Sequence, residues 1–157
     1  MNFAQSADAN DFALGAAATP LLQRFEAFYQ RFSEASFDDI GAIYEESVRF
    51  VDPVHELEGL ASLTPYLQKS LDNVRFCYFE FQNRVIGESE VSYVWCMRFA
   101  HSKLNDGAEI EVPGMSYLRF DEKVLYHRDF YDMGAMVYEH VPVMRWGVQV
   151  IKNRIAS

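Results

Sequence analysis

Four long strand-like runs fill the second half of this 157-residue chain, and they constrain its fold more than any other feature. The runs span Val74–Ile86, Glu90–His101, Ala108–Phe120 and Val124–Asp132. Only short segments separate them, and one of these, Asn105–Gly107, has the Asn-Asp-Gly sequence that strongly favours a hairpin turn. Consecutive strands joined by short turns pair antiparallel, so the sequence predicts a four-stranded antiparallel meander.

Helices are predicted before this meander. Thr19 is a plausible N-cap with Pro20 in the first turn, and apolar residues then recur at helical spacing: Leu21, Leu22, Phe25, Phe28, Tyr29 and Phe32. Further elements are predicted in this order: a helix over Phe37–Glu46, a short strand at Val48–Val51, a helix over Gly59–Asn73 and, after the meander, a helix over Ala135–Ile155 interrupted by Pro142. Residues 1–18 have no clear period, and we expect a flexible tail before one domain over 19–157.

Helices followed by antiparallel strands are typical of an α+β domain. We expect a strongly curved, mostly antiparallel sheet wrapped around an N-terminal helical hairpin and a third helix. Such a sheet would form a conical barrel whose concave side is a pocket lined by alternate strand residues.

Composition excludes several classes of partner. The chain has 14 Lys and Arg against 23 Asp and Glu, a formal charge of −9, so nucleic acid and anionic membranes are unfavourable partners. No apolar run approaches the roughly 18 residues that cross a bilayer, and no Lys or Arg precedes the short apolar N-terminal stretch, as a signal peptide would require. We expect Cys77 and Cys96 to be buried free thiols in a reducing cytoplasm, and we expect no metal site, because two cysteines supply half of a structural zinc site at most.

Alternation along the last strand places His127, Asp129 and Tyr131 on one face. One interpretation is a carboxylate that holds an imidazole beside a ligand, which is a general acid/base arrangement. The other is a polar patch at a sheet interface that is satisfied by hydrogen bonds and does no chemistry.

Two further features also have two interpretations. Asp52 could be a catalytic base, but an aspartate before Pro53 often only ends a strand. The large apolar residues Trp95, Met97 and Phe99 share a strand face and form either core or pocket wall.

Several short segments resemble one superfamily. Leu21–Phe25, Phe50–Val54 and Gly59 are similar to the ketosteroid isomerase branch of the nuclear-transport-factor-two-like superfamily. His127–Asp132 resembles the last strand of SnoaL-like polyketide cyclases and limonene epoxide hydrolases. The resemblance spans roughly residues 19–134 and implies a conical α+β barrel, usually a dimer, with an apolar pocket and no cofactor.

The resemblance assigns roles residue by residue. Asp52 matches the general base of the isomerase, whereas its two oxyanion donors fall on Phe25 and Ser116. A phenyl ring donates nothing, and losing one such donor costs on the order of 3 kcal/mol, so efficient ketosteroid isomerisation is not expected. The epoxide hydrolase pairs an arginine with a carboxylate two residues later, but Ala100 stands at that position after Arg98.

Two functions are therefore expected as alternatives. The first is a cofactor-independent isomerase, cyclase or hydrolase acting on an apolar ketone, polyketide or terpenoid-like substrate. Asp52, His127 and Asp129 would be catalytic, in a pocket lined by Phe25, Trp95, Met97, Phe99, Ser116 and Tyr131. The second is a non-catalytic domain that binds a small apolar ligand or serves dimerisation. We also expect a homodimer through the outer sheet face, because residues such as Tyr126 and Phe130 would otherwise leave a large apolar patch exposed.

Overall fold

The computed structural model of the protein describes residues 19–140 and 142–155, and the predicted tail over residues 1–18 lies outside the described residues. Its strands are β1 (Tyr44–Val51), β2 (Glu56–Glu58), β3 (Val74–Ile86), β4 (Glu90–His101), β5 (Ile110–Phe120) and β6 (Val124–Tyr131). Its helices are α1 (Pro20–Gln30), α2 (Leu60–Ser70), α3 (Met133–Met136) and α4 (Pro142–Ile155), with 3-10 turns η1 (Phe32–Glu34), η2 (Phe37–Ala42), η3 (Asn105–Gly107) and η4 (Tyr138–His140).

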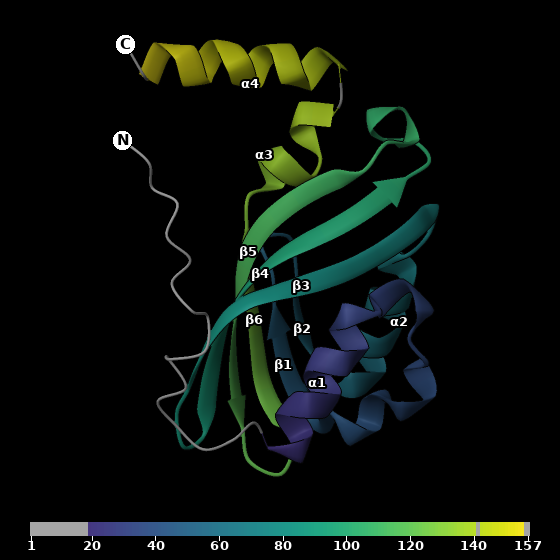
Figure 1. The fold of residues 1–157 in the computed structure, drawn as a ribbon, viewed down its shortest axis with the longest axis vertical. Helices are drawn as coiled ribbons and strands as arrows, with labels where there is room; N and C mark the ends of the chain where they lie inside the picture. The colour runs from purple at the N-terminus through teal and green to yellow at the C-terminus, as the bar shows by residue number, and fades with distance from the viewer. Residues whose placement is uncertain (1–18, 141, 156–157) are drawn as a thin grey trace, which may run out of the picture.

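The six strands form one curved sheet in the order β2-β1-β6-β5-β4-β3. Every neighbouring pair is antiparallel except β1 and β6, which run parallel. The end strands β2 and β3 do not pair with each other, so the sheet curves without closing, and α1 and α2 pack against it (Figure 1). The prediction of an α+β cone with a mostly antiparallel sheet is confirmed.

The predicted helical hairpin is wrong in its second half. The chain forms the 3-10 turn η2 and then enters β1 at Tyr44, four residues before the predicted strand. The side chain of Ser36 accepts a hydrogen bond from the Asp38 amide, which caps η2, but Gly41 follows within six residues and gives no support to a longer helix. Local spacing suggested a helix here, and pairing with β6 selected a strand instead.

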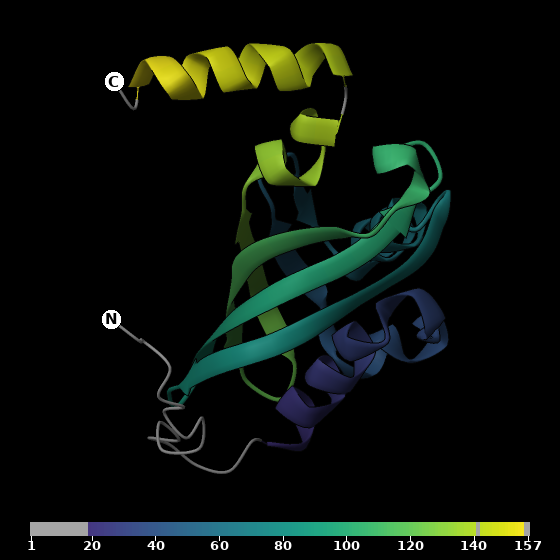
Figure 2. The same ribbon diagram turned by 45° about the horizontal axis from the view of Figure 1, so that its top comes forward.

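The C-terminal helix also differs from the prediction. Asp132 ends β6 and caps the short α3, since its carboxylate accepts a hydrogen bond from the Gly134 amide. Pro142 does not interrupt a helix but begins α4, where its fixed φ and missing N–H are tolerated. In both views α4 lies beyond the end of the cone (Figures 1 and 2).

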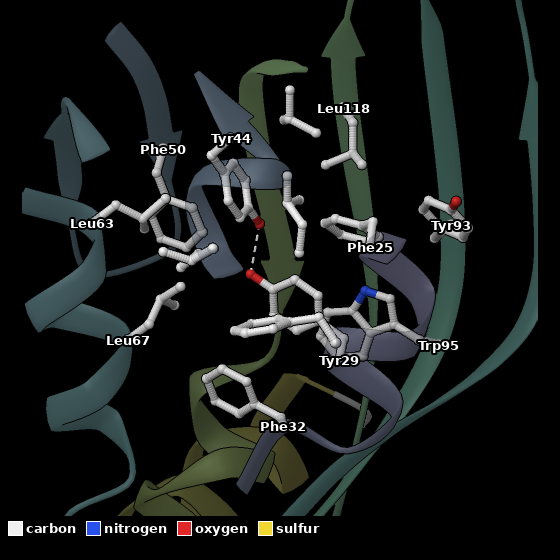
Figure 3. Packing of buried hydrophobic residues seen from close by; sticks show 14 of the residues in the cluster. Phe25, Tyr29, Phe32, Tyr44, Phe50, Leu63, Leu67, Tyr93, Trp95 and Leu118 are labelled. Carbon is white, nitrogen blue, oxygen red and sulfur yellow. Dashed lines mark hydrogen bonds between the residues drawn. The ribbon is translucent and has the colours of Figure 1, made fainter. Parts of the chain in front are cut away.

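Aromatic rings fill the interior between α1 and the sheet. The phenyl ring of Phe25 packs on Tyr29, Tyr93 and His127 at centroid distances of 4.7, 5.5 and 5.5 Å. Figure 3 shows Phe25, Tyr29 and Tyr93 among the buried side chains. The indole of Trp95 occupies the space above Gly114, where an added Cβ would lie 2.1 Å from a ring carbon. The glycine in the middle of β5 is therefore required by the close approach of the Trp95 ring, which would clash with any larger side chain there.

Candidate functional site

A continuous chain of hydrogen bonds runs along the concave face at β4, β5 and β6. The indole N–H of Trp95 donates to Ser116 Oγ over 2.8 Å, and the Ser116 hydroxyl donates to Asp129 Oδ1 over 2.5 Å. His127 Nε2 lies 2.7 Å from the same oxygen. Alternation puts the two β6 side chains on one face, and the antiparallel register puts Ser116 opposite Asp129. One carboxylate oxygen therefore receives two hydrogen bonds.

The chain continues on the other side of the imidazole. His127 Nδ1 is 2.8 Å from the hydroxyl of Tyr44. The hydroxyl of Tyr44 is in turn 2.7 Å from that of Tyr29, and Figure 3 draws this second bond as a dashed line. An ionised Asp129 can only accept, so His127 Nε2 carries the proton that it donates. A neutral ring then accepts from Tyr44 at Nδ1, and Tyr44 accepts from Tyr29. Each bond in this chain has one donor and one acceptor.

Burial keeps these phenols protonated. Desolvation raises the pKa of Tyr29 well above its ordinary value, and the charge of Asp129 raises it further. Desolvation likewise raises the pKa of Tyr44, together with its contact with Tyr29. Both hydroxyls therefore remain available as hydrogen-bond donors at neutral pH.

Asp129 presents its second oxygen differently from the first. Oδ2 accepts no hydrogen bond from the residues that the structure describes, and the side chain keeps 14% of its surface exposed. In the described residues, every fully buried side-chain polar atom has a hydrogen-bond partner. Because Oδ2 has no such partner there, it is not fully buried, and a bound molecule can reach it. A carboxylate fixed through one oxygen and accessible through the other can exchange a proton with a bound molecule.

The parallel pairing of β1 and β6 brings a second carboxylate to the same region. Phe50 lies beside His127, so Asp52, which directly follows β1, and Asp129 on β6 each come two residues later. Both oxygens of Asp52 are occupied: Oδ1 accepts from the amides of Val54 and His55 at 2.7 Å, and Oδ2 accepts from the Tyr66 hydroxyl. These three bonds hold the turn between β1 and β2 against α2.

Tyr131 lies near both carboxylates. Burial raises the pKa of Tyr131, and the charges of Asp52 and Asp129 raise it further, so the phenol stays protonated at neutral pH. Its ring is 6.4 Å from that of Trp95, and its hydroxyl makes no hydrogen bond with the described part of the chain. Tyr131 therefore offers an unused donor beside the acidic groups.

The described residues enclose two spaces of different size on the concave face. The smaller has a volume of about 10 Å³, room for about one water molecule, and is lined by Phe25, Tyr29, Phe79, Phe81, Trp95, Ser116, His127 and Asp129. The larger has about 260 Å³ and is lined by Phe32, Ser70, Leu71, Val74, Cys77, Met97, Phe99, His101, Leu104, Met136 and Val137. Phe32, which lines the larger space, packs against Tyr29 and Phe79, which line the smaller, so rings separate the two.

The structure divides the residues predicted for the site into three groups. The small space is lined by Phe25, Trp95, Ser116, His127 and Asp129. The larger cavity is lined by Met97 and Phe99. The third group, Asp52 and Tyr131, lies beside these where β1 and β6 end.

Three tyrosines of this region were not predicted to belong to the site. Tyr29 and Tyr44 complete the hydrogen-bond chain, and Tyr66 holds Asp52. Tyr44 and Tyr66 could have been found only from the pairing of β1 with β6 and from the packing of α2 on β1.

Within the described ranges 19–140 and 142–155, no three His, Cys, Asp or Glu side chains are grouped so that they could hold a metal ion. The described helices include none with the length and apolar character needed to span a bilayer.

Comparisons with known proteins agree with this architecture. The family model of the SnoaL-like domain matches residues 25–127, while no curated protein sequence matches. A ketosteroid isomerase-like protein from Catenulispora acidiphila DSM 44928, crystallised with trimethylamine, aligns at 11% identity and a TM-score of 0.67, covering 79% of this chain and 93% of that one. At such identity the likeness concerns the fold alone.

Two further structures are similar. A protein from Shewanella denitrificans OS-217, provisionally described as a SnoaL-like polyketide cyclase, aligns at 19% identity with a TM-score of 0.63, covering 75% of this chain and 95% of that one. TerC co-crystallised with polyporic acid aligns at 14% identity with a TM-score of 0.64, again covering 75% of this chain and 95% of that one. Because the family model matches well over half of its residues, this chain belongs to the SnoaL-like domain family.

Proposed function

We propose that this protein is a cofactor-independent acid/base enzyme acting on a small apolar carbonyl compound, such as a ketone, polyketide or terpenoid-like molecule. The observation that carries the proposal is the state of Asp129, whose Oδ1 is held by His127 and Ser116 while Oδ2 accepts no hydrogen bond from the described residues. Rigid support of one oxygen with access to the other suits a group that takes up and returns a proton.

The proposed step is a proton shift next to a carbonyl. Asp129 Oδ2 takes a proton from the carbon beside the carbonyl, the C–H electron pair forms a C=C bond to the carbonyl carbon, and the C=O π pair moves onto the oxygen, which becomes the enolate oxygen. The Tyr131 hydroxyl donates a hydrogen bond to that oxygen, replacing the donors that Phe25 and Ser116 do not supply. In an isomerisation, the neutral carboxylic acid then returns its proton to another carbon of the enolate. In a cyclisation, the enolate carbon bonds to a second carbonyl carbon of the substrate, and the acid gives its proton to the alkoxide oxygen that forms there.

The 260 Å³ cavity is the proposed ligand chamber, and the reaction requires the rings of Tyr29, Phe32 and Phe79, which separate it from Asp129, to move apart when the ligand binds. Met97 on its wall lies two residues along the concave face from Trp95, whose indole begins the hydrogen bonds to Asp129. The volume is just below the usual range for drug-sized ligands, which favours a molecule of one or two rings. The fold neighbours crystallised with trimethylamine and polyporic acid support small-molecule binding in this fold.

Hydrogen–deuterium exchange into ligands tests the proposal without knowledge of the product. Ketones, lactones and fatty acids are first screened for compounds that raise the melting temperature. Ketone hits are then incubated in D2O, and deuterium at the carbon beside the carbonyl is followed by NMR. Asp129→Asn should slow exchange on the order of a hundredfold or more, while Asp121→Asn, the same change in an exposed turn, should leave it unaltered. Equal exchange rates in the wild type and Asp129→Asn would refute the assignment.

Asp52 is the alternative base, as its match to the isomerase implies. For it to act, the Tyr66 hydroxyl or an amide donor would have to leave its carboxylate. If Asp52→Asn and not Asp129→Asn abolishes exchange, the base is Asp52.

A non-catalytic ligand-binding domain is the second candidate function. It is favoured by the near-complete filling of the space around His127 and Asp129, which leaves only about 10 Å³. This function would be supported by ligands that raise the melting temperature of the protein but exchange no proton for deuterium in its presence. We also propose a cytoplasmic location, because Cys77 and Cys96 are free and buried.

A further inference from the structure

Helix α4 exposes an unusual amount of apolar surface. Met144, Trp146, Val150, Ile151 and Ile155 are all exposed, Trp146 to 74% and Ile155 to 81%. By contrast, α1 buries five of its apolar side chains. The main contacts of α4 are with η4, and both views show it beyond the cone (Figures 1 and 2). Large apolar patches left uncovered usually mark an interaction site.

The exposed residues lie on two sides of the helix. At about 100° per residue, Met144, Ile151 and Ile155 form one stripe, and Trp146 and Val150 form another centred about 140° away. A helix lying in a membrane interface presents one apolar side and one polar side. Apolar stripes on two sides fit a helix that packs between protein surfaces.

Charge indicates which protein surface this is. The sequence of α4 contains Arg145, Lys152 and Arg154 and no acidic residue, so the segment is +3, and since the whole chain is −9, the rest is −12. A second copy of this chain therefore attracts α4 electrostatically. An anionic membrane would repel the rest of the molecule.

The convex face of the sheet offers a matching surface. Val94, Met115 and Phe130 are exposed there and lie in register across β4, β5 and β6, with the Arg128 guanidinium stacked on Phe130. Farther along β4, Arg98 is bonded to three glutamates. The apolar stripe thus leads into a cluster with two excess negative charges, formed by Arg98 with Glu80, Glu109 and Glu111.

The two surfaces also match in length. The rise from Trp146 to Arg154 along α4 is about 12 Å, and the distance from Val94 to Arg98 along β4 is about 13 Å. Trp146 can therefore lie over the apolar stripe while Arg154 lies near the glutamates. Each molecule carries both surfaces, so two copies can satisfy each other in a closed two-fold arrangement.

We infer that α4 is exchanged between two copies of this chain, the helix of each copy packing on the convex sheet face of the other. The contact is made twice in the dimer, once in each direction. It uses two different surfaces of the molecule, which sets it apart from a sheet-to-sheet or a helix-to-helix dimer.

Light scattering on purified full-length variants tests the exchange. The wild type should show a two-chain mass, and either Ile151→Lys on the helix or Met115→Glu on the sheet should raise the dissociation constant at least a hundredfold. Gln149→Lys, which adds the same charge to the polar side of α4, should leave the mass unchanged. Circular dichroism confirms that each variant is folded.

Mixing the two disrupted variants gives the decisive result. The Met115→Glu chain keeps an intact helix and the Ile151→Lys chain keeps an intact sheet, so the mixture should recover a two-chain species through one of the two contacts. Failure to recover it, a two-chain mass for either variant alone, or a one-chain mass for the wild type would overturn the exchange.

Fluorescence of Trp146 distinguishes the second copy from two other surfaces that α4 could contact, its own sheet and a membrane. Trp95 is buried, so we expect its emission to stay constant. A blue shift that follows the two-chain mass supports the exchange. A blue shift in a one-chain species would mean that α4 folds back on its own sheet. A blue shift only on addition of phosphatidylglycerol vesicles would mean that it binds membranes. Either result would overturn the exchange.

Discussion

The hydroxyl of Tyr44 joins the two halves of the buried hydrogen-bond chain, since it contacts both Tyr29 and His127. All three side chains are buried, so each polar atom depends on its neighbour in place of water. This fixes the ring of His127, and through it the position of Asp129. In the function that we propose, these contacts keep the reactive oxygen of Asp129 in place.

Tyr44→Phe should destabilise the protein by about 1–3 kcal/mol, because it leaves His127 Nδ1 and the Tyr29 hydroxyl without their partner in a buried region. Urea denaturation measures the loss. Tyr126→Phe makes the same chemical change on the outer face, where the hydroxyl bonds no described residue, and should alter stability by less than about 0.5 kcal/mol. Equal effects of the two variants would contradict the buried network.

Cys77 should make stability depend on pH in the alkaline range. Burial raises the pKa of this thiol from 9.0 to about 12. Above pH 9 the unfolded chain loses the thiol proton while the folded chain keeps it, so stability is full below pH 9 and falls as pH rises toward 12.

Cys77→Ala should reduce this slope by up to about 1.4 kcal/mol per pH unit. Urea denaturation of both proteins between pH 7 and the alkaline range provides the measurement. An unchanged slope would show that the folded protein lets the thiol ionise.

At the scale of elements, the parallel pair β1–β6 and the short α3 determine the candidate site. The pair brings Asp52, directly after β1, to the same end of the strands as Asp129 on β6, and α3 supplies Met136 to the wall of the larger cavity. Only four residues form α3, so its position depends on the cap at Asp132 and on contact with β5.

Asp132→Ala should loosen α3 by removing the bond to the Gly134 amide, at a cost of about 1 kcal/mol. Amide hydrogen exchange at residues 134–137 should accelerate about fivefold, while exchange in β6 stays constant. Ser36→Ala removes the cap of η2, away from the cavity, and should not affect α3. If amide exchange at residues 134–137 is equally slow in Asp132→Ala and Ser36→Ala, packing alone holds α3.

At the scale of the whole molecule, charge limits the partners. The excess of acidic over basic residues gives −9, and positive charge is concentrated only in α4. Phosphate backbones are therefore repelled by most of the surface.

We predict no binding of single-stranded or duplex DNA in physiological salt at protein concentrations up to about 100 µM, the weak end of non-specific binding. Fluorescence anisotropy of labelled oligonucleotides checks this, with a basic protein of similar size as the positive control. A saturable increase in anisotropy would contradict this prediction and show that the positive charge of α4 outweighs the negative charge of the rest of the chain.

The sequence by itself determined the α+β class, the four long strands and the face that His127, Asp129 and Tyr131 share. These follow from hydrophobic period and turn residues, which act between neighbours in the chain. It also identified Trp95, Met97 and Phe99 as a single apolar face, although it left core and pocket wall as alternatives.

Only the tertiary structure decided that Tyr44 enters a strand, that Asp52 and Asp129 become neighbours and that Trp95 lies over Gly114. The division of the concave face into a nearly filled space beside His127 and a larger apolar cavity also came from the structure. The physical reason is the same in each case. Strand pairing and ring packing join residues far apart in the chain, and their energies outweigh the local preference of the segment around residues 37–46 for a helix.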